Sequence, residues 1–488
     1  MDEYERKRAI ARKRRAEKRK KQMIRRMVGL LVVLVVLAVA MMFGITKFGS
    51  KSGEKKSASS AGSATDSTDT ASGDTQLSEK DTVLAAADLL AQQYDYDGAI
   101  EKLAEVPDAD SDSDVATKKQ EYQDAKDSCV AVNIDEVTHI FYHTLVRDAK
   151  TGFGDADDPL TAGYQQWMTT IYEFNNITQS MYDRGYVMVR LRDLVNQTTD
   201  EDGTVHFTEN TNLMLPEDKK AFVLSVDDLS YYHCYDGRGM PSKLIIGDDG
   251  KLTNEFVEDD GTVSTGDYDV LPLMDKFLEE HPDASYKGAK GLIALTGYNG
   301  ILGYRTDGVY ESRDPEHLDD DQKKWLDAHP DFDYDQECED AKNMADFIKE
   351  DGWEFASHTW GHRHIAQISY ETLVEDTEKW EKYVSPLVGG TDTIIFAHGE
   401  DLTDSADYST DDEKFAYLKS QGYNFYCNVD STQYFLQIRD NYVRQGRRDL
   451  DGYRLYQDKI ADEADRKTTD LFDIEDVYDP DRADVPDL

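Results

Sequence analysis

Short apolar runs alternate with amphipathic segments over most of the chain. Seven runs have the length and composition of strands, at residues 137–142, 186–191, 221–226, 291–296, 353–357, 393–396 and 423–427. Segments with helical spacing fall between several of them, including 164–183, 340–350, 370–384 and 412–421. This alternation predicts a parallel α/β sheet or barrel within a domain at residues 131–460.

Two segments depart from this alternation of strands and helices. Residues 232–286 are rich in glycine and aspartate and are interpreted as an insertion with a small hairpin at 244–252, where Asp-Asp-Gly supplies the turn. Residues 461–488 are acidic and poor in apolar side chains, so we expect a loosely ordered acidic tail there.

The N-terminal region has the pattern of a membrane anchor. Residues 1–26 are basic, and residues 27–46 are apolar without a single charge. Twenty helical residues span about 30 Å, the thickness of a bilayer core. The basic flank predicts a cytoplasmic N-terminus and an extracellular body. A cleaved signal peptide, cut near 58–61, is the alternative, but the long apolar run favours an uncleaved transmembrane helix.

Two segments connect this anchor to the main domain. Residues 47–78 are mostly Ser, Ala, Gly, Thr, Asp and Lys, which predicts a disordered linker. Residues 79–130 have apolar positions at helical spacing and resemble a single tetratricopeptide-like hairpin followed by a third helix. One such repeat cannot bury its own apolar face, so we expect it to pack on its neighbour or on a protein partner. A helical spacer is the preferred interpretation and a docking module the alternative.

Charge and cysteine content exclude several classes of function. The formal net charge is −44; the first 26 residues hold 13 basic and 4 acidic residues, which leaves 42 basic and 95 acidic residues in the remainder. So acidic a body repels nucleic acid and anionic membranes. The four cysteines show neither a disulfide framework nor a C-x-x-C motif, which argues against a cysteine metal site.

Candidate metal ligands follow two of the predicted strands. His358 and His362 come directly after the strand at 353–357, and Asp228 follows the strand at 221–226. In a parallel α/β fold the carboxyl ends of the strands meet at one rim. Two histidines and one carboxylate on a divalent metal leave positions open for water and substrate, as a catalytic site requires.

Further polar residues lie at the same predicted rim. Asp227 precedes the candidate ligand and is placed to take a proton from water. His143 ends the first strand, and His398 follows the strand at 393–396. Four strand ends therefore bring ligand-type residues together, which carries more weight than any single motif in so acidic a chain.

These residues resemble the motifs of the polysaccharide deacetylases, the group with the NodB-homology domain. Residues 222–228 are similar to the T-F-D-D motif, 357–362 to H-[ST]-x-x-H, and 141–143 to the Y-H opening strand. The resemblance spans roughly residues 132–455. It implies a distorted (β/α)7-type barrel, a divalent metal, most often zinc, on Asp228, His358 and His362, and Asp227 as the general base that hydrolyses an acetyl group.

Two motifs of that family are incomplete here. The arginine of its third motif, expected near residues 395–399, is missing, and no histidine follows His398 to serve as the acid of the last motif. His398 is predicted to replace that acid. The remaining predicted substrate-binding residues are His143, Tyr231, Trp360 and Arg444.

The sequence therefore predicts a membrane-anchored, extracellular, metal-dependent deacetylase. Its substrate would be a cell-wall or secreted glycan of the N-acetylhexosamine type, such as peptidoglycan. The alternative is a catalytically impaired glycan-binding or scaffold protein on the same fold, because two motifs are degenerate.

Overall fold

The computed structural model describes residues 78–154, 158–430, 432–482 and 485. These form two compact units that divide near residue 128. The predicted cytoplasmic tail, transmembrane helix and linker lie outside the described residues. Within the described part, no helix combines the length and hydrophobicity needed to cross a bilayer.

The described part of the first unit contains three α-helices, as the apolar spacing of residues 79–130 predicts. They are α2 (Glu79–Gln92), α3 (Tyr96–Lys102) and α4 (Ser113–Ser128). Ser78 begins the first helix by accepting a hydrogen bond from the backbone N–H of Asp81. The helices enclose a small core of their own, made of Val83, Ala87, Ala99, Leu103, Val106, Val115 and Tyr122.

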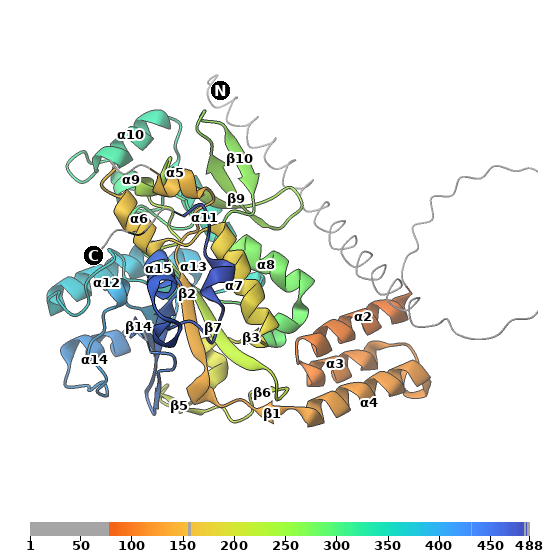
Figure 1. Cartoon of the computed structure of the whole chain (residues 1–488). Helices are drawn as coiled ribbons and strands as arrows, with labels where there is room; N and C mark the ends of the chain where they lie inside the picture. The colour runs from red at the N-terminus through yellow and green to blue at the C-terminus, as the bar shows by residue number, and fades with distance from the viewer. Residues whose placement is uncertain (1–77, 155–157, 431, 483–484, 486–488) are drawn as a thin grey trace, which may run out of the picture. The chain divides into compact units, whose positions relative to one another are not determined.

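The second unit is built on a closed barrel of seven parallel strands, which confirms the predicted fold class (Figure 1). In their order around the barrel, the strands are β11 (Leu292–Leu295), β12 (Glu354–Ser357), β13 (Thr393–Ile395), β14 (Phe425–Val429), β16 (Tyr442–Asp449), β2 (Thr138–Tyr142) and β7 (Lys220–Asp227). Pairing of β7 with β11 closes the barrel.

One of the seven predicted strands is not part of the closed barrel. The run at 186–191 forms only the short strand β3 (Tyr186–Met188), which pairs with the first half of β7. The seventh strand of the barrel is instead β16, which was not among the predicted strands and which pairs with both β14 and β2. An antiparallel strand, β15 (Leu436–Arg439), lies against β16.

Helices surround the barrel, and in Figure 1 α7, α8, α12 and α15 are seen around the central strands. The helices of the second unit are α5 (Ala149–Phe153), α6 (Thr161–Trp167), α7 (Ile171–Asp183), α8 (Val270–Glu280), α9 (Gly308–Ser312), α10 (Asp320–Ala328), α11 (Tyr334–Glu350), α12 (Tyr370–Tyr383), α13 (Ser385–Val388), α14 (Glu413–Ser420), α15 (Gly452–Ile460) and α16 (Ile474–Val477). The predicted helix at 164–183 is two helices, α6 and α7.

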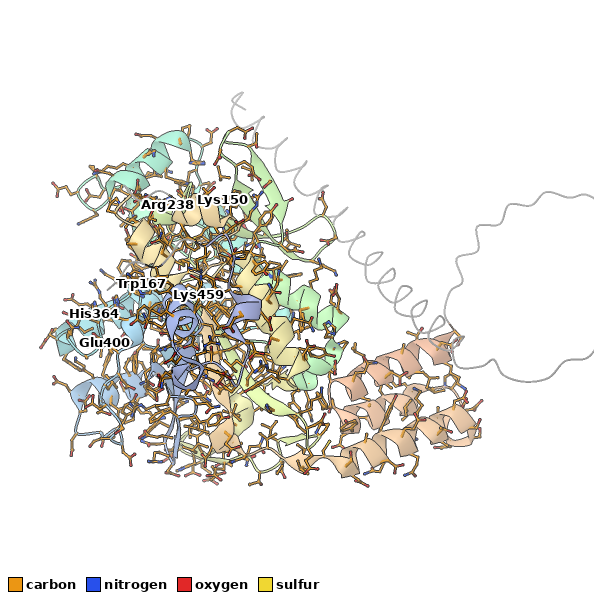
Figure 2. All side chains as sticks on the ribbon, viewed as in Figure 1. Lys150, Trp167, Arg238, His364, Glu400 and Lys459 are labelled. Carbon is orange, nitrogen blue, oxygen red and sulfur yellow. The ribbon has the colours of Figure 1, made fainter. Side chains whose placement is uncertain are left out.

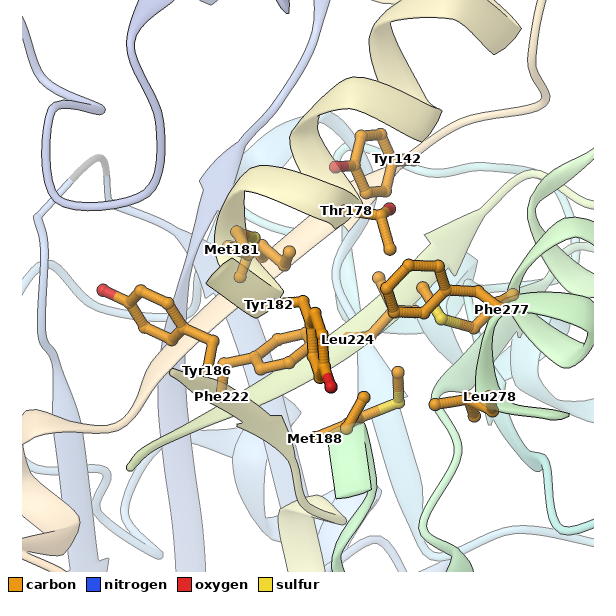
Figure 3. Close-up of a pocket in the computed structure, with 13 residues that line it drawn as sticks. Tyr142, Thr178, Met181, Tyr182, Tyr186, Met188, Phe222, Leu224, Phe277 and Leu278 are labelled. Atoms are coloured by element: carbon orange, nitrogen blue, oxygen red, sulfur yellow. The ribbon is translucent and has the colours of Figure 1, made fainter. Parts of the chain in front are cut away.

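Strand alternation separates an apolar outer face from a polar interior. Ile140 and Tyr142 of β2, with Phe222 and Leu224 of β7, face α7 and α8 and line a cavity of about 20 Å³ (Figure 3). The other face of β7 carries Ser225 and Asp227 into the barrel. The small apolar cavity is therefore part of the outer packing and lies on the opposite face from the candidate ligands.

The predicted insertion contains a small antiparallel sheet. Strands β8 (Lys243–Ile246), β9 (Leu252–Val257) and β10 (Val263–Gly266) form it, and the first two make the predicted hairpin. The insertion is shorter than expected, because α8 begins at Val270 and belongs to the ring of helices. Two further short pairs are β4 (Val195–Thr199) with β5 (Val205–Glu209), and β1 (Val130–Ala131) with β6 (Met214–Leu215).

The segment from residue 461 is not the loosely ordered tail that its composition predicted. Leu471, Phe472, Ile474 and Val477 are buried in the main hydrophobic core. Arg482 forms a fully buried ion pair with Glu173 of α7, at 2.6 Å between Nη2 and Oε2. The prediction was wrong because a few well-spaced apolar residues and one buried ion pair hold an otherwise acidic segment in place.

Replacing Arg482 with methionine is expected to destabilise the fold by about 3–5 kcal/mol, because the buried Glu173 carboxylate then loses its charge partner. Urea unfolding of the full chain measures this. Arg466→Met is the control: its partner Glu475 is exposed, so the expected loss is at most about 1 kcal/mol. Equal stability of the two variants would mean that the buried ion pair stabilises the fold no more than the exposed one.

Candidate metal and catalytic site

The two adjacent aspartates face one site because the backbone turns between them. Asp227 is the last residue of β7, and Asp228 follows with a φ of 58°, in the left-handed region. Both side chains are buried. The turn allows neighbouring residues, which would point to opposite faces of a regular strand, to serve the same centre.

His358 is fixed in the orientation of a metal ligand. Its Nδ1 lies 2.7 Å from the carbonyl oxygen of Ile395, and a carbonyl only accepts hydrogen bonds. The proton therefore sits on Nδ1, which leaves the lone pair of Nε2 free to bind a cation. The loop that follows is held by Asp376, whose carboxylate accepts hydrogen bonds from the backbone N–H groups of Trp360 and Gly361.

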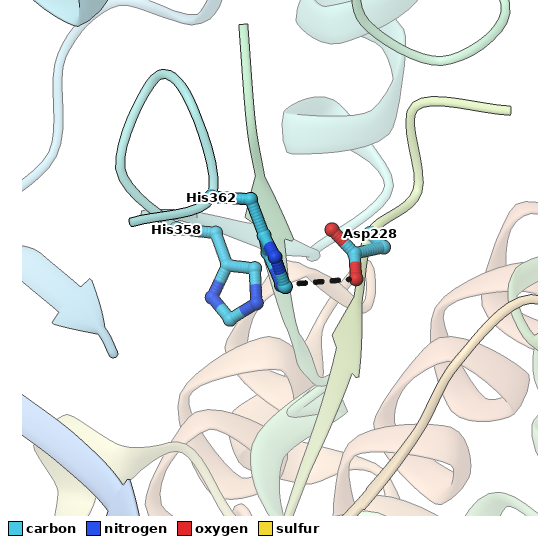
Figure 4. Close-up of side chains that lie close together, drawn as sticks. All are labelled: Asp228, His358 and His362. Atoms are coloured by element: carbon cyan, nitrogen blue, oxygen red, sulfur yellow. Dashed lines mark ion pairs between the residues drawn. The ribbon is translucent and has the colours of Figure 1, made fainter. Parts of the chain in front are cut away.

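Asp228, His358 and His362 form the predicted cluster (Figure 4). Each offers one ligand atom, and these atoms lie within 4.8 Å of one another. Nε2 of His362 is 3.5 Å from Oδ2 of Asp228. Burial lowers the pKa of His362, against the opposing effect of Asp228, which favours the neutral imidazole that a metal needs. The donor set and the fixed imidazole of His358 fit a divalent ion.

The other carboxylate oxygen of Asp228, Oδ1, accepts a hydrogen bond from a neighbouring side chain. The hydroxyl of Tyr232 donates to Oδ1 of Asp228 at 2.6 Å and lies 2.5 Å from Oγ1 of Thr296. Oδ1 is therefore engaged, and Oδ2 faces the histidines. Sequence reasoning did not identify Tyr232 or Thr296, because neither belongs to a recognisable motif.

Asp227 is held by an arginine from the last strand of the barrel. Arg447 of β16 donates two hydrogen bonds to its carboxylate, Nη1 to Oδ1 at 2.8 Å and Nη2 to Oδ2 at 2.9 Å. Burial raises the pKa of Asp227, but Arg447 and then His358 outweigh it and lower the pKa to about 2. The carboxylate is thus ionised at neutral pH. An arginine therefore holds this aspartate, although it comes from β16 and not from the region near residue 395.

His143 and Asp449 extend the polar interior at β2, which pairs with β7, and at β16, the next strand around the barrel. Asp449 pairs with Phe141 in the β16–β2 ladder, and His143 follows β2 directly. Nδ1 of His143 and Oδ1 of Asp449 are both buried, and neither finds a hydrogen-bond partner in the described part of the chain. Burial raises the pKa of Asp449, while Arg447 and His143 oppose that shift.

His398 lies at the outer edge of the site. Its ring is 4.2 Å from that of His362 and stacks on His364 at 3.6 Å, and its Nε2 is 3.1 Å from the backbone oxygen of His362. The exposed side chain of His364 in turn pairs with the partly buried Glu400, and both residues are labelled in Figure 2. His398 is therefore solvent-exposed and packs against a candidate ligand from outside.

Two of the predicted substrate-binding residues do not face the site. Tyr231 is buried, and its hydroxyl donates to Asp269 at 2.8 Å. Arg444 is fully buried on the outer face of β16, paired with Asp401. Trp360 is half-buried close to the site, with Lys379 4.4 Å from its ring centre. Side-chain alternation along β16 explains why Arg444 points outwards: it shares a face with Tyr442 and not with Arg447.

Comparisons with known proteins give one likeness. No protein-family model and no curated protein sequence matches the chain. Among solved structures, it is similar to the Streptococcus pyogenes deacetylase PplD in complex with acetate. The TM-score is 0.32 and the identity 13%, over 65% of this chain and 92% of that one. The barrel is established by its strand pairing, independently of this likeness.

Proposed function

We propose that this protein is a metal-dependent deacetylase that hydrolyses acetyl groups on an extracellular glycan. One observation carries the proposal. Three metal-type ligands, Asp228, His358 and His362, converge at the rim of the barrel beside a second, ionised aspartate, Asp227. A structural ion pair needs no second imidazole beside the carboxylate, whereas hydrolysis needs an open metal position and a nearby base.

Each residue of the set has a distinct task. Asp228, His358 and His362 would hold the ion, which when bound supplies a Lewis acid that polarises the acetyl carbonyl and acidifies water. Asp227 accepts the proton of the attacking water. Arg447 keeps that carboxylate ionised and fixes its orientation through two parallel hydrogen bonds.

A proton must then be given to the departing nitrogen or oxygen, and two histidines are candidates. His398 was the choice from the sequence, but its Nε2 is engaged with the backbone oxygen of His362 and its ring lies at the exposed edge. His143 has a buried Nδ1 without a partner among the described residues, and it interacts electrostatically with Asp227, Asp228 and Asp449. These contacts favour His143 as the donor.

The cellular setting is part of the proposal and comes from the sequence. The basic segment 1–26 and the apolar segment 27–46 support a single-pass anchor with a cytoplasmic N-terminus. The acidic body then faces a cell-wall or secreted glycan. The helical unit at 79–128 would separate the barrel from the membrane or bind a protein partner.

The scaffold alternative loses part of its basis. It relied on the missing arginine and the missing final histidine. Arg447 now occupies the position of an orienting arginine, and His143 offers an imidazole in the barrel interior.

Acetate release from a panel of N- and O-acetylated oligosaccharides, with and without a chelator, tests the function. We expect the full chain to release acetate, the chelator to abolish the release, and added zinc or cobalt to restore it. Release that persists in the chelator would contradict metal dependence. Oligosaccharide binding without any release would favour the scaffold alternative.

A further inference from the structure

A row of hydroxyl groups leads into the candidate ligand Asp228. Tyr232 contacts the carboxylate, Thr296 contacts Tyr232, and Oγ of Ser230 lies 3.1 Å from Oγ1 of Thr296. Ser230 and Thr296 are completely buried. The row joins the loop after β7 to the end of β11, the two strands that close the barrel.

Hydrogen-bond chemistry fixes the direction of this row. An ionised carboxylate only accepts hydrogen bonds, so Tyr232 must donate its single proton to Asp228. The Tyr232 oxygen can then only accept, which requires the Thr296 hydroxyl to donate to it. Thr296 has no proton left, so Ser230 is the donor in the shorter contact, 3.1 Å to Oγ1 of Thr296; the carbonyl oxygen of Thr296, at 3.5 Å, is the second acceptor within reach of that proton. Each donation polarises the next hydroxyl and strengthens the bond to Asp228.

The row also distinguishes the two oxygens of the carboxylate. Oδ1 of Asp228 receives the Tyr232 proton, and Oδ2 lies 3.5 Å from Nε2 of His362. A carboxylate without a partner on Oδ1 can turn and offer either oxygen, or both, to a cation. The hydrogen bond from Tyr232 to Oδ1 opposes this rotation and holds Oδ2 toward the histidines.

We infer that Tyr232, supported by Thr296 and Ser230, is a positioning residue that makes Asp228 a one-oxygen metal ligand and thereby tightens metal binding. This inference rests on the metal centre of the proposed function. It adds residues outside the recognised motifs to the centre. It also makes the loop after the aspartate pair part of the metal site.

Metal affinity of the full chain provides the test. Zinc, cobalt and manganese are titrated separately into metal-free protein, and dissociation constants are measured by competition with a chromophoric chelator. Tyr232→Phe is expected to weaken binding by about 10–100-fold, the usual effect of removing an orienting partner of a ligand. Thr296→Val is expected to weaken it less, because Tyr232 still donates to Asp228.

The double variant tests whether the hydroxyls act as one row. If Thr296 acts only through Tyr232, then Thr296→Val causes no further loss of affinity in the Tyr232→Phe background. Tyr164→Phe is the matched control. Its hydroxyl donates to the backbone oxygen of Cys234, so its loss removes a tyrosine hydrogen bond to the same loop without touching a ligand.

The outcomes separate this inference from the proposed function. Metal affinity of Tyr232→Phe equal to that of the wild type, with unchanged thermal unfolding, overturns the inference and leaves the metal centre intact. Fully additive losses in the double variant overturn the role of Thr296. A wild-type chain that binds none of the three metals overturns the metal centre itself. If Tyr232→Phe fails to fold, the comparison of Thr296→Val with Tyr164→Phe decides the question.

Discussion

Replacing Asp227 with asparagine is expected to lower acetate release by about 10²–10⁴-fold while the metal stays bound. The amide is nearly the same size but cannot accept a proton from water. Asp228, which is placed to bind the ion, is unchanged. The measurements are kcat on an acetylated oligosaccharide and metal content after dialysis.

Two companion variants distinguish loss of the base from loss of the site. His358→Ala removes a candidate ligand, so both bound metal and acetate release should disappear. Arg447→Lys keeps a positive charge beside Asp227 but loses the two parallel hydrogen bonds, so we expect an activity between those of the wild type and Asp227→Asn. Wild-type turnover in Asp227→Asn would rule out this residue as the base.

Most of the barrel strands were predictable because they are continuous apolar runs in the sequence. The runs around residues 221–226 and 291–296 are buried on both sides in the structure, and continuous apolar composition marks such strands. The exception is β16, whose sequence Tyr-Val-Arg-Gln-Gly-Arg-Arg-Asp is largely polar. Its inward side chains are satisfied by other interior residues: Gln445 bonds to His139, and Arg447 bonds to Asp227. Hydrophobicity cannot detect a strand whose buried face is polar and functional.

The prediction of a loosely ordered C-terminal segment was wrong for a related reason. Overall composition predicts disorder when few apolar residues are present. Here, however, Leu471, Phe472 and Ile474 all contribute to the core, and Asp458 accepts hydrogen bonds from the backbone N–H groups of Lys467 and Thr468. The order depends on contacts with distant elements, which composition does not record.

The candidate metal ligands were predictable, whereas their supporting residues were not. Ligand types at the ends of parallel strands are identified by chemistry and position together, as for Asp228 and His358. Tyr232 and Arg447 act through distances that only the fold sets. A single-residue shift of β16 would have turned Arg447 outwards and Arg444 inwards, so the strand register decides which arginine meets Asp227.

Replacing His143 with asparagine is expected to lower acetate release from an N-acetylated sugar by about 10²–10⁴-fold, the usual contribution of a general acid. Its effect should depend on the leaving group. An amine departs only after it receives a proton, whereas the aryl oxide of an aryl acetate departs without one. Hydrolysis of the aryl ester should therefore stay close to the wild-type rate, and bound metal should be unchanged.

His398→Asn is the matched comparison, because it removes the other candidate imidazole at the same site. Its ring lies at the exposed edge and its Nε2 is engaged with the backbone of His362, so we expect near wild-type release from both substrates. If His398→Asn instead loses amide hydrolysis and keeps aryl ester hydrolysis, the proton comes from His398. If His143→Asn loses both activities equally, His143 acts on substrate binding or on the attack by water, since protonation of the leaving group would spare the aryl ester.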